Sequence, residues 1–292
     1  MSAERAARNS SWRRLPAAEL ERHFNPRVAV CGFQRHIDDY RRLSAKAREH
    51  LAGELDLRYG EGPLQTLDAY RGRPGALPVL LFFHGGYWRS LDKHDVAFAL
   101  EALVDEGALA VNVNYDLCPA VSLDRVVAQA REAAAFVWRE AGRLGGDRER
   151  MFLAGHSAGG HLAMMCLNTD WSRSGLPAEP FKGAVALSGV FELEPVLHIS
   201  VNDDVRMDGA MARRNSPLLH PPQGRLPLLL AVGEDETPGW IAQSADFHAA
   251  CRAQGNPAEF WRLAGANHFS ILDVLAQPRH PLTRTLLRIM GL

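Results

Sequence analysis

The sequence predicts an α/β fold built on a mostly parallel sheet, and three observations support this. Apolar stretches of strand length alternate along the chain with longer stretches of helical periodicity. Residues 77–83 form a continuous apolar run, as expected of a strand that helices cover on both faces. Residues 151–167 read as a short apolar strand, a glycine-containing turn and a mostly apolar helix, which is how a parallel strand passes into its crossover.

Each element follows from its own pattern. Residues 55–59 and 65–70 alternate apolar and polar around Gly60, Gly62 and Pro63, which predicts a hairpin and hence antiparallel strands at the N-terminal edge of the sheet. The other strands are apolar runs, and the helices between them carry an apolar face. We expect these strands over residues 77–83, 109–115, 151–154, 183–187, 226–232 and 258–263. Helices are expected over residues 96–104, 123–142, 160–167, 241–254 and 281–290. The sheet would then have eight strands, with helices on both faces.

The length of 292 residues suits a single domain spanning residues 1–292. Residues 1–52 are rich in Arg, Glu and Ala with apolar residues at helical spacing, so we expect a helical extension packed on the domain. Residues 188–225 have the least regular pattern and are interpreted as a small cap near the functional site.

Composition restricts the partners. The net charge of −1 argues against nucleic acid or an anionic membrane as the main partner, which leaves a small-molecule substrate. No apolar run approaches the roughly 18 residues of a membrane span, and no signal peptide is recognised, so a cytoplasmic location is expected. The scattered cysteines favour free thiols over disulfides (Cys31, Cys118, Cys166 and Cys251). The sequence leaves open whether the chain acts alone or as a homodimer.

The segment Gly155-His156-Ser157-Ala158-Gly159 follows an apolar strand and precedes a helix. This is the pattern of a nucleophile elbow, in which a serine stands at a sharp turn and glycines allow strand and helix to approach closely. Ser157 is therefore the candidate nucleophile. A serine hydroxyl also needs a base, and an acid behind that base, to react at neutral pH.

Candidates for both groups follow Ser157 in the order serine, acid, histidine that α/β-hydrolases use. His268 lies in a glycine-containing turn after the last predicted strand, which makes it the best candidate base among twelve histidines. After the strand ending at residue 232 come three adjacent carboxylates, and the pattern alone does not decide which of them faces the histidine (Glu234, Asp235 and Glu236). Both loops follow the carboxyl ends of strands, where open α/β sheets place their sites.

The segment His84-Gly85-Gly86-Tyr87-Trp88 directly follows the predicted strand 77–83. Glycines let the backbone approach a reacting carbonyl, and backbone N–H groups aimed at its oxygen stabilise the negative charge of a tetrahedral intermediate. We expect the N–H groups of Gly86 and Tyr87, together with that of Ala158, to form an oxyanion hole.

These two segments resemble the kynurenine formamidase (arylformamidase) group of α/β-hydrolases, which is related to the hormone-sensitive-lipase-like esterases. The resemblance runs from Tyr59 to His268 and includes 187–193, 215–218 and 233–238. It implies an α/β-hydrolase fold with a small cap. In that group the acid is commonly an aspartate three residues after a glycine; in this chain Glu236 holds that position, so Glu236 is preferred to Asp235.

The resemblance implies hydrolysis of an aryl formamide such as N-formylkynurenine, with Ser157 as nucleophile and no metal or other cofactor. A carboxylesterase acting on small acyl or aryl esters with the same residues is the alternative, and a non-catalytic binding protein of the same fold is a weaker one. Four aromatic side chains are candidates for a substrate pocket, although core packing explains them as well (Tyr87, Trp88, Phe191 and Trp240).

Overall fold

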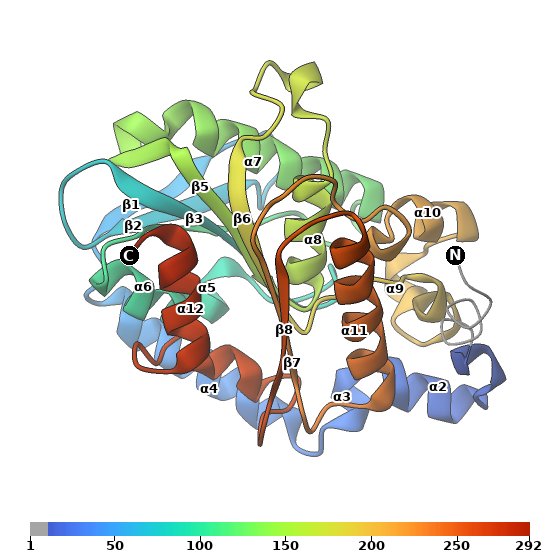
Figure 1. Ribbon diagram of the computed structural model, residues 1–292. Helices are drawn as coiled ribbons and strands as arrows, with labels where there is room; N and C mark the ends of the chain where they lie inside the picture. The colour runs from blue at the N-terminus through green and yellow to red at the C-terminus, as the bar shows by residue number, and fades with distance from the viewer. Residues whose placement is uncertain (1–10) are drawn as a thin grey trace.

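The structure, a computed structural model, describes residues 11–292, and in this part of the chain eight strands form one twisted sheet (Figure 1). The spatial order is β1-β2-β4-β3-β5-β6-β7-β8. The pairs β1–β2 and β2–β4 are antiparallel, and the other pairs are parallel. The strands are β1 (Gly53–Arg58), β2 (Thr66–Arg71), β3 (Leu77–Phe83), β4 (Leu109–Val113), β5 (Gly146–His156), β6 (Phe181–Leu187), β7 (Leu228–Gly233) and β8 (Ala258–Leu263). The predicted α/β fold, with antiparallel strands at its N-terminal edge, is confirmed.

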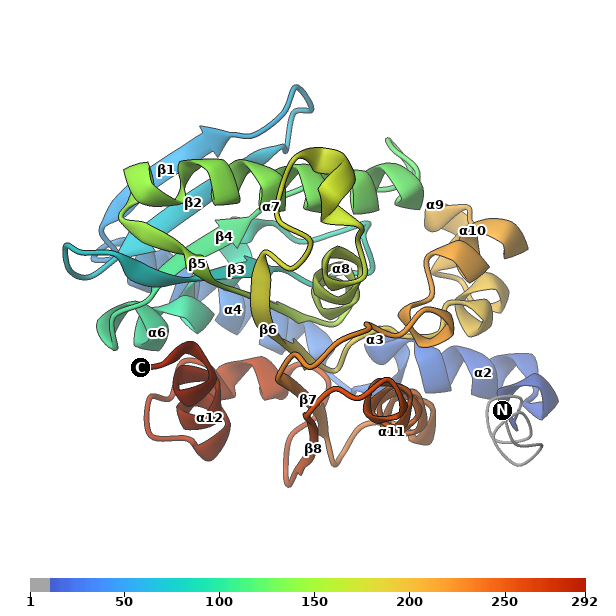
Figure 2. The same cartoon turned by 45° about the horizontal axis from the view of Figure 1, so that its top comes forward.

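Helices cover both faces of the sheet, because successive side chains of a strand point in opposite directions. In β3, Val79 and Leu81 belong to one core, and Leu80 and Phe82 belong to the other. The first core packs against α7 (Leu123–Leu144), α8 (Ala158–Leu167) and α11 (Pro238–Ala253). The second packs against α4 (Phe33–Arg48), α6 (Glu101–Asp105) and α12 (Pro281–Met290), and Figure 2 shows α7 and α6 on opposite sides of the sheet.

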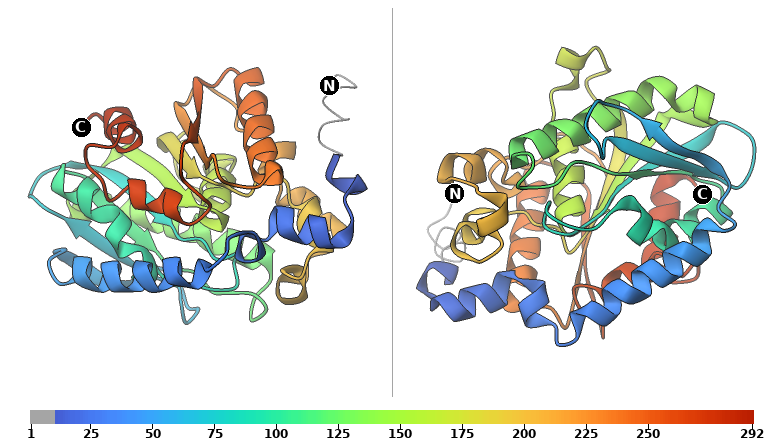
Figure 3. Two further views of the ribbon diagram at one scale, coloured as in Figure 1. Left: turned by 90° about the horizontal axis from the view of Figure 1, so that it is seen from below. Right: turned by 180° about the vertical axis from the view of Figure 1, so that it is seen from behind.

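The N-terminal helices α2 (Ala17–Phe24), α3 (Pro26–Ala29) and α4 follow one another along one side of the molecule (Figure 3). Helix α4 buries Ile37, Tyr40, Ser44 and Ala47, whose spacing of three or four residues gives it one buried face. Asn25 separates α2 from α3: its side chain accepts a hydrogen bond from the N–H of Arg27 at 3.2 Å, which caps the new helix. The chain changes direction at Asn25, and the start of α3 lies beside Ser157 at the carboxyl ends of the strands.

Residues 188–225 leave the sheet after β6 and return at β7. They contain only short helical segments: η4 (Glu194–His198), α9 (Asn202–Val205), α10 (Gly209–Arg214) and η5 (Pro217–Leu219). The excursion buries apolar side chains such as Phe191 and Val196 in the first core. Two exposed ion pairs lie at its edges: Arg214 pairs with Asp124 of α7, and Glu194 pairs with Arg13 at 2.6 Å.

The helix predicted over residues 96–104 is interrupted in the structure. Its residues form the end of α5 (Lys93–Val96), the 3-10 segment η2 (Ala97–Leu100) and most of α6. All four residues of η2 are buried against the rest of the fold, so the apolar run fills a core rather than one stripe of a continuous helix.

Two further predictions can be compared with the described residues. None of the helices in residues 11–292 is long and apolar enough to span a membrane. The four cysteines are free thiols; Cys31 is exposed and the other three are buried.

Candidate active site

Ser157 lies at a sharp turn between β5 and α8, in a backbone conformation with φ of 56° and ψ of −119° that few residues other than glycine adopt. The turn forces strand and helix together. A Cβ atom on Gly155 would lie 2.2 Å from the carbonyl carbon of Gly159, and one on Gly159 would lie 1.8 Å from the carbonyl oxygen of Phe83. Both glycines are therefore required by close approach, and the serine is held in a strained position at the carboxyl end of the sheet.

His268 lies in the loop after β8 and joins Ser157 to Glu236. Its Nε2 atom is 3.0 Å from the Ser157 hydroxyl, and its Nδ1 atom is 2.7 Å from Glu236 Oε2. A carboxylate can only accept, so Nδ1–H donates to Glu236 and the Nε2 lone pair is left to accept from the serine. The structure thus brings together the three side chains that the sequence analysis singled out.

The loop that carries His268 is fixed by its neighbours. The carbonyl oxygen of His268 accepts a hydrogen bond from His156 Nε2 at 2.7 Å, and the carbonyl of Phe269 accepts one from the Tyr40 hydroxyl. Burial, together with the nearby charge of His268, lowers the pKa of His156 to about 3. His156 is consequently a neutral hydrogen-bond donor near pH 7. The Trp240 ring also packs against the His268 ring, with 4.3 Å between the ring centres.

Among the three adjacent carboxylates, Glu236 is buried and its two neighbours Glu234 and Asp235 are exposed. Its second oxygen accepts a hydrogen bond from the Gly233 N–H at 2.8 Å and another from the Ser188 hydroxyl. These donors fix the carboxylate in the orientation that meets the imidazole. Ser188 was not singled out by sequence reasoning, although its position directly after β6 was the available signal.

The loop after β3 has an unusual backbone, because Gly86, Tyr87 and Trp88 all have positive φ angles of 105°, 50° and 56°. The Gly86 carbonyl is held by the N–H of Arg89 at 3.1 Å and the hydroxyl of Ser90 at 3.0 Å. Gly85 places the loop against the elbow, since a Cβ on it would lie 3.3 Å from the Cβ of Ser157.

The N–H groups expected to form an oxyanion hole are free. Within residues 11–292, the N–H groups of Gly86, Tyr87 and Ala158 donate to no protein acceptor. Ala158 is the first residue of α8, where an N–H has no partner inside its own helix. Unused donors beside a serine can receive the oxygen of a reacting carbonyl.

The predicted aromatic pocket needs correction. Tyr87 does line the cavity at Ser157, but the other three residues do not. Trp88 is fully buried and donates to His161 Nδ1 at 3.2 Å, and Phe191 stacks on Phe247 at 4.2 Å. Trp240 is buried, with its ring centre 4.3 Å from that of His268, and it does not line the cavity. Large aromatic side chains contribute most when they are fully buried, and that preference explains all three positions.

The cavity at Ser157 is lined instead in part by the N-terminal helices. Helix α3 contributes Pro26 and Arg27 to the lining that also contains Ser157 and His268, and α4 contributes Ile37 and Tyr40. The lining that the sequence analysis missed comprises Asn25, Pro26, Arg27, Ile37, Tyr40, Arg89, Leu91 and Phe269. For the lining residues of α3 and α4, the sequence signal was the helical spacing of apolar residues within 1–52.

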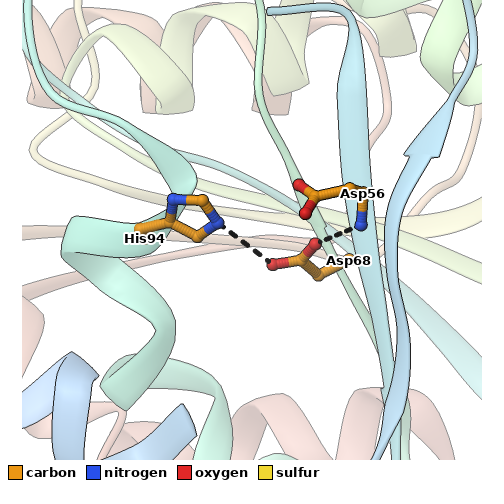
Figure 4. A group of neighbouring side chains, drawn as sticks. All are labelled: Asp56, Asp68 and His94. Atoms are coloured by element: carbon orange, nitrogen blue, oxygen red, sulfur yellow. Dashed lines mark hydrogen bonds and ion pairs between the residues drawn. The ribbon is translucent and has the colours of Figure 1, made fainter.

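One cluster away from this cavity has the composition of a cation site: Asp56, Asp68 and His94 lie with their ligand atoms within 4.8 Å of one another (Figure 4). A cation of the chain already lies there. The Lys93 ammonium is 2.6 Å from Asp56 Oδ1 and also bonds Asp68, and the lysine side chain is only 1% exposed. Tyr70 donates to the other oxygen of Asp68 at 2.8 Å. This arrangement is a buried ion pair that ties α5 to β1 and β2.

We predict that Lys93→Met destabilises the fold by about 3–5 kcal/mol, because it removes the buried ammonium that pairs with the fully buried Asp68 carboxylate. Chemical denaturation measures the change. The double variant Lys93→Met/Asp68→Asn should recover part of the loss, since no unpaired charge then remains buried. A single variant within about 1 kcal/mol of the wild type would contradict this assignment.

Comparisons with known proteins place the chain in a family. The family model of the prolyl oligopeptidase family matches residues 132–286, and the model BD-FAE matches residues 67–176. The kynurenine formamidase of Salmo salar is 32% identical over 296 residues, and that of Danio rerio is 31% identical over 295; each alignment covers 97% of this chain and 99% of the relative. The structure of a candidate thioesterase from Silicibacter sp. TM1040 superposes with a TM-score of 0.81, at 25% identity, over 94% of this chain and 99% of that one.

The sheet, the strained serine turn and these relatives define an α/β-hydrolase enzyme with a serine-hydrolase type of activity. Within that class, the chain belongs to the kynurenine formamidase group and, through its C-terminal half, to the broader prolyl oligopeptidase family.

Proposed function

We propose that this protein hydrolyses an aryl formamide of the N-formylkynurenine type to the aryl amine and formate. The observation that carries the proposal is the continuous hydrogen-bonded chain from Glu236 through His268 to Ser157, which opens on a cavity next to three unused N–H groups. The names of the full-length relatives, both kynurenine formamidases, support the formamide as the bond that is cleaved.

In the first half of the proposed reaction, Ser157 Oγ attacks the formyl carbon while His268 Nε2 takes the hydroxyl proton. The carbonyl oxygen becomes an oxyanion, which the N–H groups of Gly86, Tyr87 and Ala158 stabilise. The C–N bond then breaks, and His268 returns the proton to the departing aryl nitrogen. The products of this half are the aryl amine and a formyl ester on Ser157.

In the second half, water attacks the formyl ester while His268 takes one proton from that water. The ester bond breaks and the proton returns to the Ser157 oxygen. The product is formic acid, which releases the remaining proton of the water to solvent and leaves as formate. Glu236 keeps its negative charge throughout, because its role is to hold the Nδ1–H tautomer and to stabilise the imidazolium that forms twice.

The cavity supports an aryl leaving group. Apolar side chains of Ile37, Tyr40, Leu91 and Phe269 line it, as a planar ring requires. The formyl group is the smallest acyl group, so it needs little space beyond the serine and the oxyanion donors. An aryl amine also leaves more easily than an alkyl amine, since its nitrogen lone pair is delocalised into the ring.

Ester hydrolysis is a second candidate function, favoured by the similarity to the candidate thioesterase structure. The same serine, histidine and oxyanion donors would act on an ester or a thioester. The difference lies only in the leaving atom, which for a formamide must be protonated by His268 as it departs.

Turnover of N-formylkynurenine and of p-nitrophenyl acetate by the purified protein separates the two functions, with the Ser157→Ala variant as the blank for both. We expect kcat/KM for the formamide to match or exceed that for the ester, although the ester is intrinsically the more reactive compound. A value for the formamide that is orders of magnitude below that for the ester would overturn the formamidase proposal and leave the esterase.

A further inference from the structure

Arg27 is a cation that lines the active-site cavity. It lies in α3 and lines the same cavity as Ser157 and His268. Its Nη2 atom donates to the Ser90 hydroxyl at 2.6 Å, and its guanidinium lies 5.7 Å from the centre of the Phe33 ring. Within residues 11–292, no carboxylate lies within ion-pair distance of it.

The surroundings make this charge unfavourable in the unliganded protein. Burial, and secondarily the like charge of Arg89, lower the pKa of Arg27. Arg89 lines the same cavity, but its charge is offset by an ion pair with Asp204. The nearby Glu21 carboxylate already accepts hydrogen bonds from the Asn25 side chain and from Ser200. A half-buried guanidinium left in this state gains most from an anion that enters the cavity.

We infer that Arg27 determines substrate specificity by binding a carboxylate on the leaving-group side of the substrate. This inference rests on the proposed function, and it narrows the substrate to aryl formamides that carry an acidic side chain. The apolar lining, Ile37 and Phe269 among it, takes the ring. The guanidinium takes the anionic end, where its planar set of N–H donors matches the two oxygens of a carboxylate.

A positioning role is the competing explanation for Arg27. On that explanation Arg27 would act through the Ser90 hydroxyl, which accepts from Arg27 and donates to the Gly86 carbonyl of the loop proposed as the oxyanion hole. The two roles predict different kinetics. Loss of loop support lowers kcat for every substrate, whereas loss of a carboxylate contact raises KM only for substrates that carry one.

The test compares Arg27→Gln with the wild type on two substrates, N-formylkynurenine and 2-formamidoacetophenone. The second has the same aryl ketone and formamide but no carboxylate. We expect kcat/KM for N-formylkynurenine to fall about 10- to 100-fold, mainly through KM, which is the range for a lost charged hydrogen bond. The neutral substrate should change by no more than about threefold. Arg27→Lys, which keeps the charge, should restore part of the loss.

Arg35→Gln is the matched control, because Arg35 is an exposed arginine of α4 that does not line the cavity. Equal losses on both substrates through kcat would overturn the inference in favour of loop support. An unchanged KM for N-formylkynurenine in Arg27→Gln would also overturn it. If Arg27→Gln does not fold, the wild-type protein alone tests the inference. A wild-type kcat/KM for N-formylkynurenine less than about tenfold above that for 2-formamidoacetophenone would contradict it.

Failure of the proposed formamidase function can be distinguished from failure of the carboxylate site at Arg27. If the wild type cleaves esters but neither formamide, the formamidase proposal fails, and the role of Arg27 is read from inhibition of ester hydrolysis. Kynurenine should then inhibit the wild type more strongly than 2-aminoacetophenone does, and Arg27→Gln should remove that difference. Equal inhibition by the two compounds in the wild type would overturn the carboxylate site itself.

Discussion

Replacing Ser157 with alanine is expected to lower kcat for N-formylkynurenine by about 10⁵- to 10⁶-fold, the range for loss of a serine nucleophile from an intact triad. The loss is large because neither a water molecule nor the free N–H groups of Gly86 and Tyr87 can replace a hydroxyl that His268 already contacts at 3.0 Å. Steady-state turnover, corrected for the uncatalysed rate, measures it.

Folding and binding should survive in Ser157→Ala, because the hydroxyl is removed without adding atoms at the turn. A serine-to-alanine change on the exposed Ser172 is the control and should leave kcat within about twofold. If Ser157→Ala retained more than about a hundredth of the wild-type kcat, the attacking group would have to be something other than this serine.

The second large effect is expected at Glu236. Its replacement by glutamine should lower kcat by about 10⁴-fold, because the glutamine amide can donate to His268 Nδ1 and so favours the tautomer with a proton on Nε2. In that tautomer the imidazole cannot accept the Ser157 proton. The change nearly preserves the shape of the side chain, so the loss reports on the tautomer rather than on packing.

Asp235→Asn provides the matched control for Glu236→Gln, since it makes the same chemical change one residue earlier on an exposed side chain. We expect its kcat to stay within about twofold of the wild type. The reverse result, with Asp235→Asn inactive and Glu236→Gln active, would mean that the loop after β7 takes a different conformation in the working enzyme.

The sequence was most informative where function depends on contacts between neighbouring residues. The elbow is a local structure, and the close approach of Gly155 and Gly159 to adjacent backbone is what makes its pattern recognisable. The positions of His268 and Glu236 after strand ends were equally predictable, since the carboxyl ends of parallel strands meet at one edge of the sheet. The choice of Glu236 over Asp235 needed the resemblance, because three adjacent carboxylates carry no periodicity.

The cavity could not be predicted in this way, because its walls depend on packing between distant segments. Arg27 and Tyr40 reach the site only because α3 and α4 lie across the strand ends, and no local pattern places them there. Of the four predicted pocket aromatics only Tyr87 lines this cavity, and the other three are packed in the core. Trp88 belongs to the same loop as Gly86 and has a positive φ, yet its side chain is buried in the core, where it donates to His161.

The most direct test of the central claim is labelling of the wild-type protein by a fluorophosphonate, with the modified residue located by tandem mass spectrometry and the remaining N-formylkynurenine turnover followed in parallel. The account predicts a single adduct on Ser157 and a loss of turnover in proportion to the fraction labelled. An adduct on a different residue, or full turnover after complete labelling of Ser157, would contradict it.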